Sequence, residues 1–523
     1  MEKLQKICQQ ILAGIGVCIF AILTFYAWRY TVNMPALDEV LYTTKDVVWK
    51  PVLFVAAVFV IVFGVGKLAK HLEERKLHLL AIILSCAVAA FGMFLVNSVH
   101  AWPIGDQRQV FMAALQRKQG IFPELEQGQY FTIWPFQLGL TNLYAFFYQF
   151  TKAQVPEIIQ TVQAVFAGVI VYLGFRITGE LFHNKRAECL YLVLAPGFVP
   201  LYLYVLYLYG ETFGVCAALF GIWCFLVANR EEEANTYRIL GWLFLAGVAI
   251  MLTYIVRSAL IIVWIAMVII QILLFFRRKR WLPLIMLVFA LGLSMLGQRL
   301  MIGYVEKQAD VELGRGMPII TWIAMGLQDN PKGMGQGSFN DYNINLFKEC
   351  GLDREETSAR AKQYIGERFS YWSKHPGEML DFFKNKVLNQ WNEPSYGAFT
   401  MTRVHVEPDE WVEDAYYGKT HDKLYQYLNC YQAAAYLAVL GYFVWLFVGR
   451  RKEVCYLPGL ILIGGFLFSV IWEAKSRYIY PYVVMALPCI AGSIVIYYDR
   501  LGKLVLQCSK RIKECLQNKK HNS

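Results

Sequence analysis

Stretches of about 18 to 22 apolar residues recur along this 523-residue chain and constrain its fold more than any other feature. At 1.5 Å per helical residue, one such stretch crosses a hydrocarbon core about 30 Å thick. A β-barrel strand would need about half that length, so the stretches predict helices. Composition agrees, because 57% of the residues are hydrophobic and 17% are charged, against roughly 25% charged in a soluble domain. We therefore predict an all-α polytopic membrane protein.

Hydropathy places about twelve spans along the chain. The first follows Lys3 and Lys6 and resembles a signal peptide, but it lacks a small-residue cleavage site, so we interpret it as a retained helix. Most of the twelve cysteines lie inside spans without zinc or redox spacing and are expected to be core thiols. The predicted spans are 7–29, 51–68, 77–97, 157–177, 188–208, 211–229, 239–255, 258–276, 282–301, 430–448, 455–472 and 479–498.

Basic residues form short clusters between these spans. The net charge is +11, but no basic face of a folded domain is indicated, so nucleic acid is not an expected partner. With twelve spans, every cluster falls on the side of the N-terminus, in agreement with the positive-inside bias. We therefore predict a multi-pass protein of the cell membrane, surrounded by membrane lipid, with both termini cytoplasmic. The clusters are Lys67/Lys70/Arg75/Lys76, Lys185/Arg186, Arg277/Arg278/Lys279/Arg280, Arg450/Arg451/Lys452 and Lys510 to Lys520.

The segment Tyr130–Thr151 is long and uncharged enough to span, but counting it would put the basic clusters on opposite faces. It carries Pro135 and Gln137 among aromatic residues, a composition typical of a helix that lies in the membrane interface. We predict a re-entrant or juxtamembrane helix on the outer side. Two short helices, around 104–118 and 132–150, are expected along this surface.

Three outer loops are expected, at 30–50, 98–156 and 303–429. We expect the chain to consist of three parts. Residues 1–302 form an N-terminal transmembrane module with the outer loop 98–156, residues 303–429 form an extracytoplasmic loop domain, and residues 430–523 form the C-terminal helices and a basic cytoplasmic tail. Because the outer loops are large, we expect the functional site on the outer face of the membrane.

The large loop shows two helical patterns, an amphipathic one over 353–372 and a second over 377–391. Its Gly-rich stretch 333–339 indicates a loop and not a phosphate cradle, because no strand precedes it and no GK[ST] follows. Cys350 and Cys430 lie in or beside this loop. They either pair in an oxidising exterior or remain free, and sequence does not decide between the two.

Asp106 is the strongest candidate for function, because a carboxylate at a membrane surface is costly unless it is used. It begins the predicted helix outside the third span. Its structural alternative is a helix-start role, favourable by about 1 kcal/mol. Glu211 begins a predicted span on the outer side, where the same alternative applies.

The surroundings of Asp106 resemble a known family. An acidic residue opens an outer helix, a Gly-aromatic turn follows at Gly128 and Tyr130, and an aromatic-Pro-x-x-x-Gly helix then begins at Trp134 and Pro135. This order is similar to the first outer loop of the GT-C membrane glycosyltransferases, and in particular to family 39-type enzymes such as protein mannosyltransferases and aminoarabinose transferases. The match covers about 100 to 190, with weaker similarity beyond.

The resemblance implies an enzyme that transfers a sugar, hexose or pentose, from a polyprenyl-phosphate carrier to an extracytoplasmic glycan, lipid or protein acceptor. It implies that Asp106 is the general base of an inverting displacement. The family usually places this acid after the first span, where this chain has Asp38, so Asp38 is the second candidate. Glu211 corresponds to a further carboxylate of the family. Gln107, Tyr130, Trp134, Pro135 and Gln137 are expected to line the site.

The lipid-phosphate leaving group requires cations near the outer surface. Arg257, Lys475 and Arg477, with Tyr478, lie at outer span ends against the positive-inside bias, and the last three resemble the family's arginine-tyrosine-proline entry to a late span. Their alternative role is as snorkelling anchors. No cofactor is indicated; two carboxylates are compatible with a divalent cation, but they specify no metal.

The main alternative function is a multispanning transporter or lipid flippase, which also suits twelve spans with scattered charges. Transporters usually contain two similar halves and broken helices at the midplane. This sequence shows no such repeat, and its outer loops are very unequal. A scaffold function would leave Asp106, Arg257 and Arg477 without a role.

Overall fold

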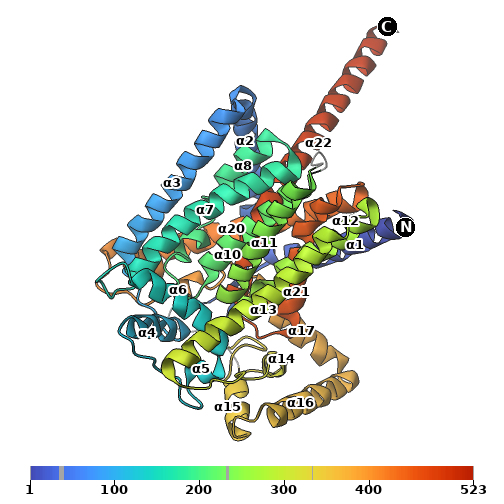
Figure 1. The fold of residues 1–523 in the computed structure, drawn as a ribbon. Helices are drawn as coiled ribbons and strands as arrows, with labels where there is room; N and C mark the ends of the chain where they lie inside the picture. The colour runs from blue at the N-terminus through green and yellow to red at the C-terminus, as the bar shows by residue number, and fades with distance from the viewer. Residues whose placement is uncertain (1, 35–39, 231–234, 332–333, 522–523) are drawn as a thin grey trace.

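The computed structural model describes residues 2–34, 40–230, 235–331 and 334–521. Long helices lie side by side and shorter helices gather at one end of them (Figure 1). Eleven helices in the described residues are long and apolar enough to cross a membrane, which confirms the predicted all-α polytopic fold. They are α1 (Glu2–Ala27), α2 (Trp49–His71), α3 (Glu74–Val99), α7 (Glu157–Phe182), α10 (Glu211–Ala228), α11 (Thr236–Val256), α12 (Ile261–Arg278, preceded by the 3-10 turn η2, Ser258–Leu260), α13 (Leu282–Ala309), α20 (Lys419–Val448), α21 (Leu457–Ile471, preceded by η3, Glu453–Tyr456) and α22 (Tyr480–His521).

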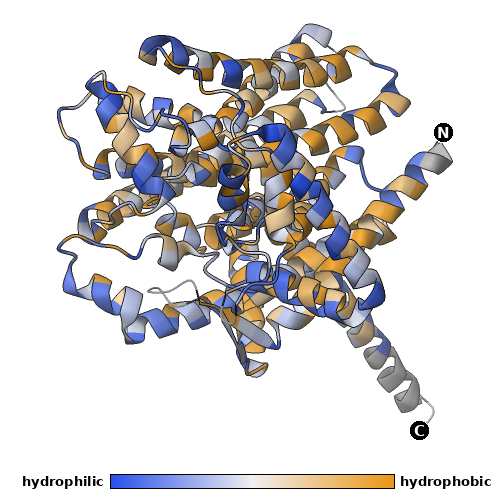
Figure 2. Ribbon diagram, turned by 90° about the horizontal axis from the view of Figure 1, so that it is seen from below, coloured by the Kyte–Doolittle hydropathy of each residue, from blue (hydrophilic) through white to orange (hydrophobic). Residues whose placement is uncertain are grey.

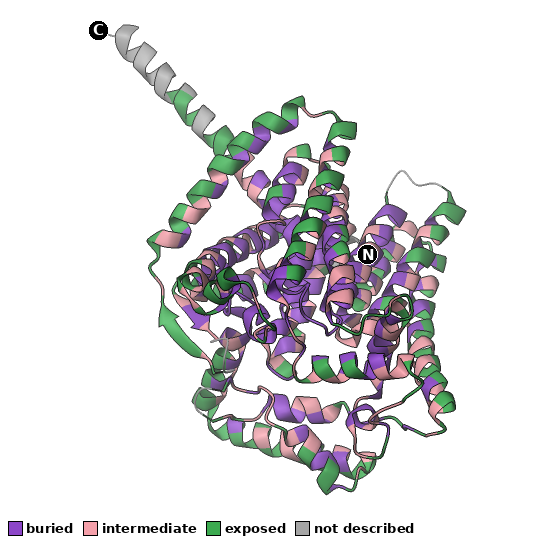
Figure 3. Ribbon diagram, turned by 90° about the vertical axis from the view of Figure 1, so that its left-hand side faces the viewer, coloured by how far each residue is buried: buried purple, intermediate pink, exposed green. Residues whose placement is uncertain are grey.

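Burial separates the core helices from the peripheral ones. In the apolar stretch of α10, 83% of the residues are buried, whereas 17% are buried in that of α13. Figure 3 shows the buried residues concentrated in the middle of the bundle. Helix α13 exposes apolar side chains such as Phe289 and Leu300, as expected for a helix that faces lipid.

The predicted span 188–208 is wrong as a continuous helix. It consists of α8 (Lys185–Leu194), a break, and the single turn α9 (Pro200–Leu203). Pro196 and Pro200 cannot donate the backbone hydrogen bonds that a helix needs, and Pro196 is followed by Gly197. The segment still crosses the bundle, because the Lys185 ammonium donates to the Leu72 carbonyl at the α2–α3 turn, whereas the Leu208 amide, after α9, donates to Gln107 at the start of α4.

The segment after α3 forms short helices, as predicted: α4 (Asp106–Lys118), α5 (Tyr130–Ile133), the 3-10 turn η1 (Pro135–Gln137) and α6 (Leu138–Tyr148). The expected helix around 104–118 is confirmed. The expected helix 132–150 is broken near its start, where Trp134 leaves the helical conformation before Pro135. No continuous helix spans 130–151, which agrees with excluding this segment from the spans.

The large loop contains six helices in its described residues. The two predicted helices are confirmed as α16 and α17, and residues 334–339 of the Gly-rich stretch form no helix or strand, whereas Gly333 lies outside the described residues. Helices α13 and α20 extend into the predicted loop, so residues 302 and 429 both lie within helices. The loop helices are α14 (Ile320–Gly326), α15 (Tyr342–Glu349), α16 (Arg354–Lys374), α17 (Pro376–Trp391), α18 (Ala398–Met401) and α19 (Glu410–Tyr417).

Two smaller features complete the fold. Strands β1 (Tyr30–Asn33) and β2 (Tyr42–Lys45) pair antiparallel, with Tyr30 opposite Lys45. Cys350 and Cys430 are both free thiols in the described structure, so the pairing that the sequence left open is not formed.

Polar contacts identify one end of the bundle. Arg277 and Gln5 both contact Glu453, at 3.2 and 2.7 Å, and Arg186 contacts Asp499 at 2.7 Å. The predicted basic cluster at 277–280 therefore lies near the N-terminal residues and the α20–α21 connection, and the cluster at 185–186 lies beside α22. Figure 2, seen from the other end, shows hydrophilic residues on the short helices and loops there.

Candidate active site

A cavity of about 1710 Å³ lies at the end of the bundle that carries the short helices. Ordinary small-molecule pockets measure about 300–1000 Å³, so this cavity can hold two substantial ligands together. Its wall combines α4, η1, α11, α13, α21 and the 3-10 turn η4 (Ser476–Tyr478) with residues of the large loop.

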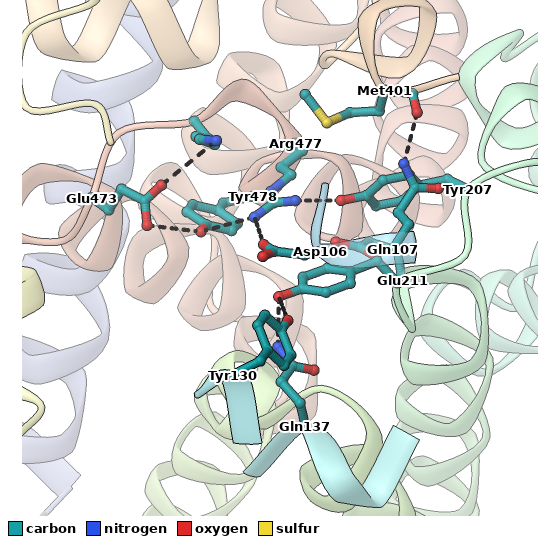
Figure 4. Close-up of polar contacts among 12 residues, drawn as sticks. Asp106, Gln107, Tyr130, Gln137, Tyr207, Glu211, Met401, Glu473, Arg477 and Tyr478 are labelled. Carbon is teal, nitrogen blue, oxygen red and sulfur yellow. Dashed lines mark hydrogen bonds and ion pairs between the residues drawn. The ribbon is translucent and has the colours of Figure 1, made fainter. Parts of the chain in front are cut away.

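Asp106 opens helix α4 beside this cavity. Gly105, at φ +52°, provides a backbone conformation that side-chain-bearing residues rarely adopt, and the chain then enters the helix. The first-turn carboxylate also complements the helix dipole. Its side chain is 41% exposed, and one carboxylate oxygen lies 3.9 Å from a terminal nitrogen (Nη2) of Arg477. Figure 4 shows the two side chains directed toward each other.

Gln107, the second residue of α4, fixes the start of this helix through two hydrogen bonds. Its Nε2 donates to the Met401 carbonyl at 2.9 Å, and its Oε1 accepts from the Leu208 amide at 3.0 Å. The side chain is buried, so both hydrogen bonds are shielded from water. Gln107 therefore ties Asp106 to the large loop and to the segment that follows α9.

Arg477 is the buried cation next to Asp106. Its Nη1 donates to the Tyr207 hydroxyl, and its Nη2 lies 3.4 Å from the Tyr478 hydroxyl. Its Nε has no hydrogen-bond partner among the described residues. A buried guanidinium with an unused donor is suited to receive an anionic ligand.

Arg257 lies in the break between α11 and η2 and forms the second cationic element. Its Nη2 is 2.8 Å from Oε1 of Glu211. Glu211 is fully buried and does not line the cavity, so its carboxylate supports Arg257. The sequence had suggested a second carboxylate facing the cavity, and Glu211 does not provide one. The guanidiniums of Arg257 and Arg477 lie over the same two rings, Tyr209 and Tyr478, at 5.0 to 5.5 Å from the ring centroids.

The remaining predicted cation, Lys475, also reaches the cavity. Its Nζ lies 3.9 Å from Glu473 Oε1, and the other oxygen of Glu473 accepts from the Tyr478 hydroxyl at 3.2 Å. The Lys475 ammonium also lies 5.6 Å from the Phe339 ring centroid of the large loop. Glu473 thus links the lysine to Tyr478.

An aromatic wall closes the side near α5 and η1. Gln137 donates to the Tyr209 hydroxyl at 2.6 Å, and the Tyr130 hydroxyl lies 3.5 Å from the same oxygen. Burial, reinforced by the Asp106 carboxylate, raises the pKa of Tyr130 well above its ordinary value, so its hydroxyl stays protonated. Trp134 and Pro135 line the cavity, whereas Tyr130 lies behind Tyr209.

The structure brings together all the predicted site residues that it describes. Asp38 lies outside the described residues. Sequence reasoning missed Tyr207 and Tyr209, which were assigned to a span or its end, although the closely spaced tyrosines of YLYVLYLYG are unusual for a lipid-facing helix. It also missed Met401, because a contact with Gln107 across the large loop leaves no local pattern.

A ready-made metal centre is not apparent in the described part of the chain, where no group of three or more His, Cys, Asp or Glu side chains is close enough to hold an ion. Asp106 directs a carboxylate to the cavity, and Glu211 is committed to Arg257. Around Asp106 the site therefore combines this carboxylate with the cations Arg257, Lys475 and Arg477.

Solved structures similar to this chain include two of an oligosaccharyltransferase from Archaeoglobus fulgidus. AglB, in complex with an inhibitory peptide and a dolichol-phosphate, gives a TM-score of 0.46 at 15% identity, covering 83% of this chain and 52% of that one. The apo form gives 0.45 at 14% identity, covering 85% and 52%. This chain thus spans about half the length of these proteins.

ArnT from Cupriavidus metallidurans, in the apo state, gives a TM-score of 0.34 at 13% identity, covering 79% of this chain and 77% of that one. These neighbours are GT-C membrane glycosyltransferases, the superfamily that the sequence resembles. No curated protein sequence matches the chain. A family model matches residues 4–495, nearly the whole length. The chain therefore belongs to the family described as conserved hypothetical integral membrane proteins.

Proposed function

We propose that this protein is a membrane glycosyltransferase that transfers a sugar from a polyprenyl-phosphate donor to an acceptor hydroxyl. The observation that carries the proposal is the pairing of the accessible Asp106 carboxylate with the buried Arg477 guanidinium, at 3.9 Å, in a cavity of about 1710 Å³. A base and an anion-binding cation are the two groups that such a displacement needs.

The donor phosphate binds at the cationic side of the cavity. Arg477 offers its unused Nε, and Arg257 and Lys475 add positive charge. Guanidinium groups held in place by Tyr207 and Glu211 need little reorganisation when the phosphate arrives. The same cations stabilise the negative charge that develops on the leaving phosphate.

Asp106 then acts on the acceptor. The acceptor hydroxyl oxygen attacks the anomeric carbon, the bond from that carbon to the phosphate oxygen breaks, and Asp106 takes the hydroxyl proton. The products are the glycosylated acceptor and a polyprenyl phosphate that keeps the bonding electrons. A single displacement inverts the anomeric configuration. Phosphate bound to Arg477 replaces its contact with Asp106 and leaves the carboxylate free for the acceptor.

Binding of farnesyl phosphate to the purified protein in nanodiscs tests this proposal. We expect Arg477→Ala to weaken binding by roughly tenfold to a hundredfold, because a hydrogen-bonded charge contact is lost. The matched control is Arg108→Ala, which removes an exposed arginine of α4 that does not line the cavity. Equal binding by both variants, or none by the wild type, would contradict the proposed donor site. Vectorial movement of the lipid without sugar transfer would favour a flippase.

A further inference from the structure

Lys386 is a fully buried lysine that the proposed chemistry does not use. It lies in α17, at 0% exposure. Lysine is almost never fully buried unless its charge is paired. Its ammonium donates to the carbonyl of Gly326, the last residue of α14. The contact joins two helices of the large loop across sixty residues of sequence.

Two glycines allow the chain to pack closely around this ammonium. Gly337, at φ +68°, lies where a β carbon would overlap the Gly326 carbonyl and approach the Lys386 ammonium to 3.1 Å. A β carbon on Gly326 would lie 2.6 Å from the Trp472 carbonyl. The Gly-rich stretch that the sequence identified as a loop is therefore a closely packed one, held between Lys386 and the chain at Trp472.

The same segment contacts the residues that lead into η4. The Ala474 amide donates to the Gly337 carbonyl at 2.8 Å, and the Phe339 ring lies 5.6 Å from the Lys475 ammonium. The rings of Trp322 in α14 and Trp472 stack at 5.8 Å. Residues 326–331 and 334–339, which we name the Gly segment, thus support residues 472–475 immediately before Arg477.

We propose that Lys386 is a positioning residue that fastens the Gly segment against residues 472–475 and thereby holds Lys475 and Arg477 toward the donor phosphate. The role in phosphate binding rests on the proposed function, whereas the fastening itself rests on the contacts alone. Loss of the ammonium leaves the Gly326 carbonyl without this donor and loosens the segment.

Hydrogen exchange tests the fastening without any substrate. In Lys386→Met we expect amide protection across the Gly segment and residues 472–475 to fall by roughly tenfold to a hundredfold, the effect of losing a charged donor. Lys384→Met, an exposed lysine of the same helix, is the control and should change nothing.

Farnesyl phosphate binding tests the positioning role. Lys386→Met should weaken it by roughly two- to thirtyfold, as expected for indirect coupling. Gly337→Ala, which opens the segment from the other side, should give the same loss of protection if Lys386→Met does not fold. Unchanged protection in Lys386→Met would overturn the proposal, and so would lost protection with wild-type affinity. Failure of the wild type to bind farnesyl phosphate would contradict the proposed function, while the exchange experiment would still decide the fastening.

Discussion

Asp106 and Arg477 were both predicted from the sequence, but for different reasons. Asp106 stood out by its resemblance to a family motif, and Arg477 by its position at an outer span end against the positive-inside bias. The structure brings them to 3.9 Å. The supporting contacts could not be predicted, because Gln107 and Met401 are 294 residues apart and their hydrogen bond depends on tertiary packing.

At the scale of the residue, we expect Asp106→Asn to reduce sugar transfer by about 10²–10⁴-fold, because the amide keeps the size of the side chain but cannot accept a proton. Farnesyl phosphate binding should remain. The measurement is transfer of labelled sugar from a panel of polyprenyl-phosphate-linked donors in proteoliposomes.

Asp409→Asn is the control, because it changes an exposed carboxylate at the start of α19 whose side chain makes no cap hydrogen bond. Full transfer by Asp106→Asn combined with loss in Asp38→Asn would assign the base to Asp38.

At the scale of the element, the sequence predicted helices well and their breaks poorly. Hydropathy counts apolar residues and does not register a break between them, so the segment with Pro196 and Pro200 was taken as one span. The segment that contains Pro135 was excluded from the spans for two reasons. It carries polar residues, and counting it would place the basic clusters on opposite faces of the membrane. The break at Pro135 is held by the large loop, since the Met317 amide donates to the Ile133 carbonyl at 3.0 Å.

Gly316, which precedes Met317, allows a test of this contact between the large loop and the break at Pro135. In Gly316→Ala the new β carbon would overlap Pro135 and lie 2.6 Å from the Ile133 carbonyl oxygen, in addition to adopting φ +63°. We expect a loss of about 1–3 kcal/mol from the clash, beyond about 1–2 kcal/mol from the backbone.

Gly314→Ala is the matched control, at φ +67° with no neighbouring atom within 4 Å, and should show the backbone cost alone. Thermal unfolding in detergent and the rate of proteolysis measure the difference. Equal effects of the two substitutions would show that the contact with Pro135 does not hold the break.

At the scale of the whole molecule, the predicted fold class is confirmed, and the predicted sidedness gains a structural basis. Contacts of Arg277 and Arg186 place two basic clusters at the end of the bundle opposite the cavity. The orientation of that end toward the cytoplasm stays a prediction. Hydropathy and charge determine such global properties because they sum over many residues, whereas the cavity depends on individual contacts.

Cysteine labelling of intact cells tests the orientation. With the native cysteines replaced, an impermeant reagent should reach a probe introduced by Lys362→Cys on α16 but not one introduced by Glu73→Cys at the α2–α3 turn, both exposed positions. The second probe should react after permeabilisation. The reverse pattern would place the cavity in the cytoplasm and remove the extracytoplasmic acceptor from the proposal.

The cavity wall combines residues from the first quarter of the chain with residues from its last quarter, since Asp106 faces Arg477 and Gln107 is tied to Met401. A membrane protein is synthesised from its N-terminus, and early segments insert first. The nascent chain therefore carries the carboxylate long before it has the arginine or the loop residue that holds it. On the proposed function, a partly made chain in the membrane cannot bind and consume lipid-linked sugar, because the donor site is completed only as synthesis ends.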